Sequence, residues 1–343
     1  MRVLLTGAAG FIGNRIGVAL RDRGHEVVGV DMMLPAAHGP DAAVPDGVLL
    51  ADVRDPDALT ELLPGVDVVC HQAAMVGAGV DAADAPAYAS HIDYATAVVL
   101  AQMYAAGVGR LVLASSMVVY GQGAYVCAEH GAVDPLPRRR SDLDAGVFEH
   151  RCPLGEEPVR WSLVGEDAPL RPRSLYAAGK TAQEHYAVAW CEAAGAAVTA
   201  LRYHNVYGPG MPRDTPYSGV AAIFRSALEK GEAPKVFEDG GQMRDFVHVD
   251  DVAAANVAAI ESDRGGFTAA NVCSGRPVSI LDVARTVCDA HGGPAPQVTG
   301  QYRSGDVRHI VADPAHAADV LGFRAAIDPA DGLREFAFAP LRA

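Results

Sequence analysis

A tyrosine and a lysine stand four residues apart in the stretch SLYAAGK, residues 174–180. The alanines around them favour a helix, and helical positions four apart share one face. On that face the cation of Lys180 would stabilise the ionised phenol of Tyr176 and lower its pKa, whose ordinary value is about 10. A tyrosinate is a base that can take a proton from an alcohol. Because this spacing also arises by chance, the rest of the sequence must support the hypothesis.

The N-terminal segment has the pattern of a strand, a turn and a helix. RVLLT (2–6) is typical of a buried parallel strand, and residues 11–23 are typical of an amphipathic helix. Between and within them, Gly7 permits a tight turn, Gly10 lets backbone approach a pyrophosphate, and Gly13 lets helix and strand pack closely. This arrangement predicts a dinucleotide site.

The second strand, EVVGVD, ends in an acidic residue, Asp31. A carboxylate at this place accepts hydrogen bonds from the adenosine ribose hydroxyls and repels a 2′-phosphate. Neither Met32 nor Met33 supplies the arginine that NADP would require. We therefore predict NAD as the cofactor.

Strand and helix patterns continue to alternate, which predicts an α/β fold with a doubly wound parallel Rossmann sheet. Further strands, or strand–helix pairs, are expected at 48–55, 66–74, 110–116, 199–210, 244–260 and 269–287, with a long helix at 88–106. The third strand should end at Asp52–Val53, where an adenine can rest. The fifth ends in Ser115 and Ser116, at the sheet edge where catalytic groups gather.

Composition excludes several classes of protein. The net charge of −14 argues against nucleic acid or an anionic membrane as partner, and no apolar run is long enough to span a membrane. The start, MRVLLTGAAG, lacks a signal-peptide pattern, so we expect a cytoplasmic protein. The arginines at 138–140 are interpreted as a solvated loop.

The segment 121–173 is long, polar and irregular, and we interpret it as an insertion that covers another part of the molecule. Six scattered cysteines without a C-x-x-C pair indicate reduced thiols. Cys127 and Cys152 share the insertion, but two ligands do not make a zinc site, so no metal is predicted.

Six motifs follow one another in order: TGAAGFIG, HQAA, SSMVVYG, YAAGK, RYHNVYGPG and RDFVHVDDVA. Together they resemble an extended short-chain dehydrogenase/reductase of the nucleotide-sugar epimerase and dehydratase group. Within that group the stretches GQGAYVCAEHG, FEHRCP, PYSGVAAIF and VTGQYRSGDVRHIVAD are most similar to the dTDP-L-rhamnose 4-epimerase family.

The resemblance implies roles for individual residues. Tyr176 matches the general base, Lys180 its partner that also holds the nicotinamide ribose, and Ser116 the group that hydrogen-bonds the reacting sugar hydroxyl. The implied cofactor-binding residues are Gly7, Gly10, Phe11, Ile12, Gly13, Asp31, Asp52, Val53, Ala73, Tyr176 and Lys180. The implied substrate-binding residues are Ser116, Asn205, Val220, Lys235, Phe237, Arg244 and Arg303. The last two would grip the diphosphate, and Phe237 would pack on thymine.

Two positions depart from the family pattern. Ile92 stands where the family usually has an asparagine, and RCPLGEEP lacks the second cysteine that usually follows RCP.

The implied reaction is C4 epimerisation of a nucleotide-activated 6-deoxyhexose such as dTDP-L-rhamnose, through a transient 4-keto sugar. A 4,6-dehydratase needs an acid–base pair where this chain has Met117 and Val118, so we exclude it. A nucleotide-sugar 4-ketoreductase and a UDP-hexose 4-epimerase stay open as alternatives. A catalytically silent NAD-binding protein is a further alternative, which the complete Ser116–Tyr176–Lys180 set disfavours.

The resemblance also implies the organisation of the chain. Residues 1–203 with 244–262 would form the NAD-binding Rossmann domain, and 204–243 with 265–343 a smaller α/β lobe that binds the nucleotide sugar. We expect a homodimer that pairs through the helix after Tyr88 and the helix of Tyr176.

Overall fold

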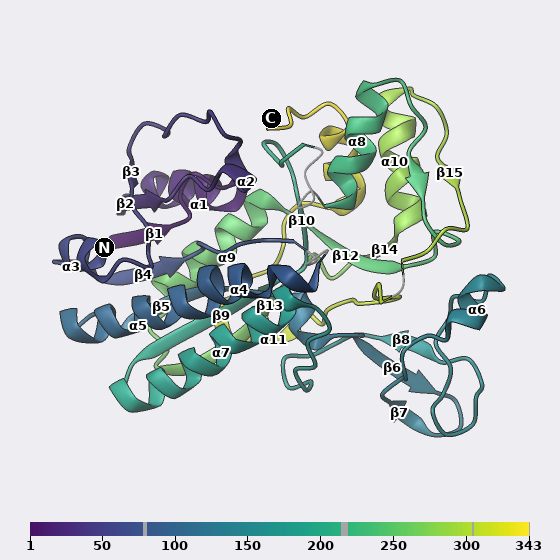
Figure 1. The fold of residues 1–343 in the computed structure, drawn as a ribbon, viewed down its shortest axis with the longest axis horizontal. Coiled ribbons are helices and arrows are strands. Elements are labelled where there is room, and N and C mark those ends of the chain that lie inside the picture. The colour runs from purple at the N-terminus through teal and green to yellow at the C-terminus, as the bar shows by residue number, and fades with distance from the viewer. Residues whose placement is uncertain (78–80, 214–218, 304, 343) are drawn as a thin grey trace.

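The computed structural model describes residues 1–77, 81–213, 219–303 and 305–342. Its centre is a seven-stranded parallel sheet with the order β13-β9-β5-β4-β1-β2-β3 (Figure 1). Its strands are β1 (Arg2–Thr6), β2 (Glu26–Asp31), β3 (Val48–Leu50), β4 (Val68–His71), β5 (Arg110–Ser116), β9 (Ala197–Tyr203) and β13 (Gly266–Val272). The order reverses between β1 and β4, as in a doubly wound Rossmann sheet, so the predicted fold class is confirmed.

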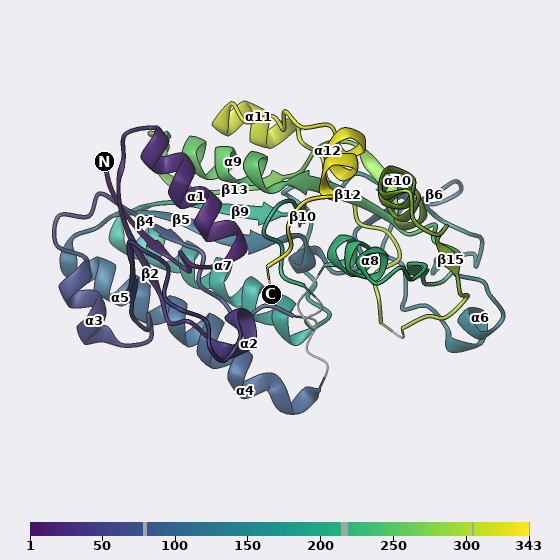
Figure 2. The same ribbon diagram turned by 90° about the horizontal axis from the view of Figure 1, so that it is seen from above.

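Helices cover both faces of this sheet (Figure 2). One face carries α1 (Phe11–Asp22), α9 (Val249–Glu261) and α11 (Ala315–Leu321), and the other carries α3 (Pro56–Leu62), α5 (Ala95–Ala106) and α7 (Leu175–Ala194). Successive strand residues point to opposite faces, so Val3 and Leu5 belong to the first core and Leu4 to the second. Burial on both sides explains why the strands are continuous apolar runs.

A smaller lobe lies beside the carboxyl edge of the sheet. It contains α8 (Val220–Glu229), α10 (Ile280–His291) and α12 (Pro329–Phe336), which share an apolar core. Its strands are β10 (Asn205–Tyr207), β12 (Met243–His248) and β14 (Pro277–Ser279) in one sheet, and β11 (Lys235–Val236) and β15 (Gln297–Val298) in another.

Two strands correct the predicted division of the chain. β12 was expected to rejoin the Rossmann domain, but it pairs with β10 and β14, and only the following helix α9 packs on the central sheet. β13 was expected in the smaller lobe, but it pairs with β9 along all seven of its residues. The order of strands along the chain does not determine which strand lies at the edge of the sheet. Here β13 pairs with the edge of β9, which would otherwise be unpaired.

The insertion 121–173 is more regular than expected. It forms a three-stranded antiparallel sheet of β6 (Ala124–Cys127), β7 (Gly131–Val133) and β8 (Arg160–Ser162), and the helix α6 (Arg140–Asp144), between β7 and β8 in the chain, lies near this sheet in Figure 1. The remaining short helices are α2 (Pro35–His38), η1 (Ala82–Asp84), α4 (Ala85–Tyr88) and η3 (Met117–Tyr120).

Two predicted boundaries shift. The expected helix at 88–106 consists of a π-helical segment, η2 (Ala89–Tyr94), and then α5. β3 ends at Leu50, so Asp52 and Val53 follow the strand instead of ending it. No helix in the described part of the chain is long and apolar enough to cross a membrane.

Candidate active site

The predicted catalytic residues come together at the carboxyl end of β5. Ser116 is the last residue of that strand, and its hydroxyl is hydrogen-bonded to that of Tyr176 in the first turn of α7. Lys180 lies one turn further, with its Nζ 5.8 Å from the centre of the Tyr176 ring. Ser174 caps this helix by accepting a hydrogen bond from Ala177 N, so the helix begins just before Tyr176. Tyr176 and Lys180 therefore lie on one face of α7, as their spacing predicted.

The pKa of Tyr176 differs from the sequence-based expectation. Burial raises it to about 12, although the hydrogen bond with Ser116 opposes this shift. Burial also lowers the pKa of Lys180 to about 7, since the residue is only 3% exposed. Its ammonium group donates a hydrogen bond to the carbonyl oxygen of Ala114 at 2.8 Å. In the protein alone, desolvation therefore outweighs the attraction between phenolate and cation that the spacing suggested.

A buried ion pair and its hydrogen bonds link the elements that carry Ser116, Tyr176 and Lys180. Glu184, one turn after Lys180, forms a two-point pair with Arg202 of β9, with an Nη2–Oε2 distance of 2.7 Å. The hydroxyl of Ser115 donates to the same carboxylate, and Arg202 also donates to the Tyr120 hydroxyl at 2.8 Å. Both charged side chains are almost fully buried. This network connects α7, β5 and β9, which carry or flank the catalytic groups.

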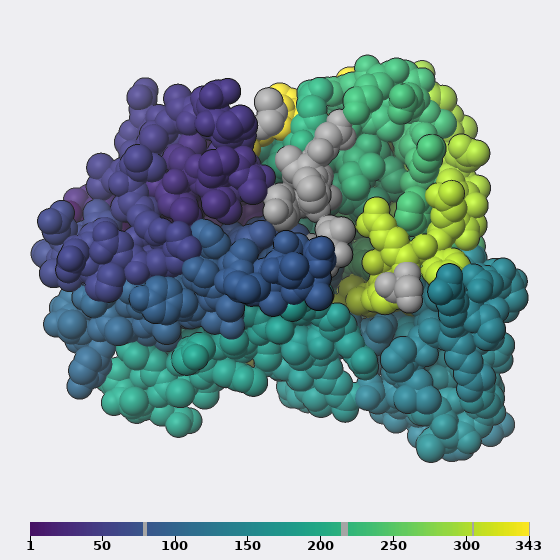
Figure 3. Space-filling view, in the orientation of Figure 1, coloured from purple at the N-terminus to yellow at the C-terminus, as the bar shows by residue number. Residues whose placement is uncertain are grey.

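A cavity of about 380 Å³ opens beside these residues. Its lining comes from the N-terminal half and from the lobe, which form different parts of the face in Figure 3, in purple to blue and in green. All the predicted cofactor-binding residues line it, namely Gly7, Gly10, Phe11, Ile12, Gly13, Asp31, Asp52, Val53, Ala73, Tyr176 and Lys180. Ser116 is not among the lining residues, although Ser115 is.

The floor of this cavity is made of closely approaching backbone. Gly7 has a φ of +69°, and a Cβ there would come within 2.9 Å of Ala73 N. A Cβ at Gly13 would overlap the carbonyl oxygen of Gly7. α1 begins after Gly10 with no side chain capping it, so its first N–H groups are available to an anion.

Asp31 lies at the other end of the same floor and is 8% exposed. Burial opposes its ionisation, but His38 and the N–H groups of Met33 and Ala9 donate to it, so its pKa lies below the usual value. The carboxylate is therefore held ionised and fixed in place. Asp52 is less available, because Arg54 occupies it through its N–H and its guanidinium.

One cavity residue had no signal in the sequence. Arg342, at the C-terminal end, lines the cavity and donates to the carbonyl oxygens of Ala9 at 2.9 Å and Ala37 at 3.2 Å. Its charge acts on that of Asp31. The sequence analysis found no arginine near Asp31, because the two residues are more than 300 positions apart and meet only through the fold.

The predicted substrate residues separate into two groups. Asn205 and Val220 line the cavity, and the buried Oδ1 of Asn205 has no hydrogen-bond partner within the described chain. Phe237, Arg244 and Arg303 do not line it. The guanidinium of Arg303 lies over the ring of Phe237 at 5.2 Å.

Arg244 belongs to this second group. It donates to the carbonyl oxygens of Met243, Val307 and Arg308, and burial lowers its pKa to about 10. Asp306 is near enough to interact with the charges of both Arg244 and Arg303. Lys235 is exposed on β11, pairing with Gln297 of β15.

The interpretation of residues 138–140 as a solvated loop is wrong for Arg138. Its guanidinium lies 2.7 Å from Glu238, and both side chains are buried. Arg308 pairs with the same carboxylate and with Glu149 and Asp239. Arg139 and Arg140 are exposed, as expected.

Ile92, the departure from the family pattern, is fully buried in the π-helical segment η2. Its carbonyl oxygen accepts a hydrogen bond from Thr96. The side chain brings no polar group to the site.

Comparison with known proteins agrees with this geometry. The sequence profile of the NAD dependent epimerase/dehydratase family matches residues 3–141 and 155–273. The dTDP-L-rhamnose 4-epimerase of Burkholderia thailandensis is 35% identical over 334 residues, covering 94% of this chain and 90% of that protein. The UDP-glucose 4-epimerase of Mycolicibacterium smegmatis is 31% identical, covering 97% and 96%.

A solved structure supports the same relationship. MoeE5 in complex with UDP-glucuronic acid and NAD superposes with a TM-score of 0.77 at 30% identity, covering 98% of both chains. The chain therefore belongs to the NAD dependent epimerase/dehydratase family, as its sequence motifs predicted.

Proposed function

We propose that this protein is an NAD-dependent 4-epimerase of a nucleotide-activated 6-deoxyhexose such as dTDP-L-rhamnose. The observation that carries the proposal is that Tyr176, which is hydrogen-bonded to Ser116, lines together with Lys180 a cavity whose floor is a glycine cradle ending at Asp31. The similarity to a dTDP-L-rhamnose 4-epimerase favours this sugar.

The residues of the cavity fit NAD. The cradle leaves no room for side chains under a pyrophosphate, the first turn of α1 offers free N–H groups, and the ionised Asp31 suits ribose hydroxyls. When bound, NAD accepts a hydride from the sugar and returns it. Arg342 brings a cation near Asp31, which weakens the repulsion between this carboxylate and a 2′-phosphate.

The chain's own residues perform the proton chemistry. The Tyr176 oxygen takes the proton of the sugar's C4 hydroxyl. Ser116 hydrogen-bonds the C4 oxygen of the sugar and aligns it. Because the pKa of Tyr176 is high in the protein alone, the base requires added positive charge in the loaded site. Lys180 is placed to hold the ribose and, when protonated, to supply part of that charge.

The 4-keto sugar must turn within the cavity before the hydride returns to its other face. We assign the contact with the sugar to Asn205, whose buried Oδ1 has no hydrogen-bond partner among the described residues. We assign the diphosphate to Arg244 and Arg303, and the base to Phe237. Arg244 now donates to backbone carbonyls, so this assignment requires it to exchange those bonds for phosphate.

Other reactions of the family fit less well. Met117 and Val118, in the η3 turn directly after Ser116, cannot move the protons that a dehydratase requires. A ketoreductase would use the same three residues but would need a fresh reduced cofactor in each turnover. A UDP-hexose 4-epimerase is the second candidate, because a UDP-glucose 4-epimerase is 31% identical over nearly the whole chain.

We further propose a homodimer that works in the cytoplasm. Tyr94, Tyr104 and Tyr186 are at least half exposed on η2, α5 and α7, the segments expected to pair. An aromatic surface of this kind suits a partner helix pair. Light scattering should give twice the chain mass at micromolar concentration, and a monomer mass at every concentration would contradict the dimer.

The decisive experiment follows deuterium at C4. With dTDP-L-rhamnose carrying deuterium at C4, and no added NADH or NADPH, we expect interconversion with the C4 epimer and retention of the label by NMR. In heavy water C4 should gain no solvent deuterium, because the exchanging proton belongs to oxygen. Loss of the label, or a need for stoichiometric reduced cofactor, contradicts the proposal. Faster turnover of UDP-glucose would move the assignment to the second candidate.

A further inference from the structure

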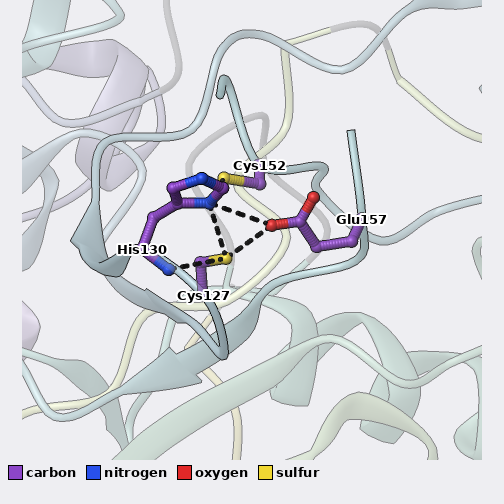
Figure 4. Close-up of side chains that lie close together, drawn as sticks. All are labelled: Cys127, His130, Cys152 and Glu157. Atoms are coloured by element: carbon purple, nitrogen blue, oxygen red, sulfur yellow. Dashed lines mark hydrogen bonds and ion pairs between the residues drawn. The ribbon is translucent and has the colours of Figure 1, made fainter. Parts of the chain in front are cut away.

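Four side chains with metal-binding atoms converge in the insertion, away from the active site: Cys127, His130, Cys152 and Glu157 (Figure 4). Their ligand atoms all lie within 4.8 Å of one another. His130 Nδ1 is 3.3 Å from Cys127 Sγ, 3.4 Å from Cys152 Sγ and 3.1 Å from Glu157 Oε1. A single ring nitrogen forms one hydrogen bond, so these three contacts are not three hydrogen bonds. Cys127 Sγ also lies 2.7 Å from Glu157 Oε1, so the four ligand atoms form one compact cluster.

Two turns of the backbone hold the cluster. Cys127 ends β6, and the turn from Cys127 to His130 leads into β7. In the facing turn, Cys152 N donates to the carbonyl oxygen of Glu157 at 2.8 Å, and Glu156 N donates back to that of Cys152 at 3.0 Å. Each turn therefore supplies two ligands from its ends, and the fold brings the two pairs together.

The first turn also directs two backbone donors at Cys127, whereas burial and the Glu157 carboxylate raise the pKa of its thiol while no ion is bound. The N–H groups of Glu129 and His130 point at Cys127 Sγ at 3.3 and 3.4 Å. Hydrogen bonds from backbone N–H groups favour the ionised form of the acceptor, which is the form that binds a metal. Both cysteines are almost fully buried, whereas His130 and Glu157 are partly exposed and give an ion a path inward.

We propose that Cys127, His130, Cys152 and Glu157 bind a structural zinc ion. Zinc bonds of about 2.0–2.3 Å place tetrahedral ligand atoms about 3.3–3.8 Å apart, which is close to the distances around His130 Nδ1. Two thiolates and an imidazole are soft and borderline ligands that suit zinc. Four protein ligands fill the tetrahedron, which is the pattern of a structural site, not a catalytic one.

The size of the insertion explains what the ion would do. The buried apolar cluster next to its sheet contains only Tyr125, Cys127, Cys152 and Val159, with Val133 and Trp161 partly buried against it. Small folding units with so few apolar residues generally need a metal or a disulfide. The sequence analysis predicted no metal because it counted only two cysteines, and His130 and Glu157 join them through the facing turns.

The ion would also steady the junction with the lobe. The hydroxyl of Tyr125 on β6 accepts a hydrogen bond from His309 N at 3.2 Å, and Glu149, three residues before Cys152, pairs with Arg308 and His309. Loss of zinc would loosen this side of the lobe while leaving the cofactor cradle in place.

The test is the metal content of the full-length protein purified without chelators. We expect about one zinc per chain by plasma mass spectrometry. After removal of zinc and addition of Co²⁺, absorption typical of tetrahedral cobalt with thiolate ligands should appear. Chelation should lower Tm, and Zn²⁺ should restore it.

Matched variants identify the ligands. Cys127→Ser and Cys152→Ser should lose the zinc and the thiolate–cobalt band, whereas Cys288→Ser, a buried free cysteine of α10, should keep both. Glu157→Gln should weaken Zn²⁺ binding at least about tenfold, and Glu156→Gln should not.

Three results would overturn the proposal. One is a folded wild type with less than about a tenth of an ion per chain and no cobalt band. The second is a Cys127–Cys152 disulfide in the purified protein, seen as an intact mass without free thiols at these positions. The third is a cobalt spectrum unchanged by Cys127→Ser. Because the cobalt measurement uses the wild type, the test does not depend on the folding of a variant.

Discussion

The floor of the cofactor cavity and the junction between the insertion and the lobe are built in opposite ways. The floor uses residues close in sequence, mostly backbone, between β1 and the end of β2. The junction uses charged side chains from four distant segments, at Arg138, Glu149, Glu238–Asp239 and Arg308–His309. A local sequence motif therefore suffices to predict the cavity floor, whereas no local pattern predicts the junction between the insertion and the lobe.

The two regions also differ in what a substitution disturbs. In the floor, an added carbon atom meets backbone that cannot move aside. At the junction, removal of the Arg308 charge weakens the compensation of the buried Glu238 and of the half-exposed Glu149 and Asp239. The catalytic edge is a third case, because Tyr176 can lose its oxygen without loss of packing. Four predictions separate these cases.

Tyr176→Phe should have the largest effect, and it should be on the reaction alone. Removal of the general base should lower kcat by about 10²–10⁴-fold or more. Tm and the amount of NAD retained should stay near those of the wild type. Tyr186→Phe, on the exposed side of the same helix, is the control and should be fully active. Near-normal turnover of Tyr176→Phe would remove this residue as the base.

Arg308→Met should have the largest effect on stability. Glu238 would lose one of its two guanidinium partners and keep Arg138, so the loss should not exceed about 3–5 kcal/mol, which is the cost of breaking an isolated buried ion pair. Urea unfolding measures the change. Arg334→Met removes an exposed pair with Asp331 and should cost no more than about 1 kcal/mol. Equal losses in the two variants would show that the junction cluster adds nothing beyond a surface contact.

Gly13→Ala should act on both stability and cofactor. The added Cβ would overlap the Gly7 carbonyl oxygen and force α1 away from β1, at a cost of about 1–3 kcal/mol. We expect less NAD in the purified protein, measured by absorbance after denaturation. Gly109→Ala is the control, since a Cβ there meets no atom within 4 Å. Wild-type NAD content in Gly13→Ala would contradict the cradle geometry.

The smallest effect concerns the pH dependence of Lys180. Burial lowers its pKa from 10.5 to about 7, so between these values the unfolded chain binds the proton more tightly. The free energy of unfolding of the wild type should therefore rise with pH relative to Lys180→Met in this range. Between about pH 7.5 and about pH 8.5 the rise should be at most about 1.4 kcal/mol. Parallel pH profiles of the two proteins would show that Lys180 stays charged in the fold.

Sequence patterns predicted the features that depend on neighbours along the chain. The strand–turn–helix of residues 2–22, the acidic end of β2 and the tyrosine–lysine face of α7 are all local, and their prediction required only period and glycine spacing. The predicted catalytic residues meet because Ser116 ends β5, and the helix α7, which carries Tyr176 and Lys180 in its first turns, packs against that strand. Their pKa values were not predictable in this way, because desolvation depends on atoms from the whole fold.

By itself, then, the sequence determined the parallel sheet, the glycine cradle and the set of predicted catalytic groups, because each follows from periodicity and from residue chemistry over a short span. Only the tertiary structure decided that β13 pairs with β9 at the edge of the sheet, that Arg342 lies near enough to Asp31 for their charges to interact, and that Arg138 is buried against Glu238. It also decided that His130 and Glu157 join two cysteines. These contacts join residues that are far apart in the chain or that lie in two separate turns. They depend on how whole helices and strands pack together, and a short stretch of sequence does not contain that information.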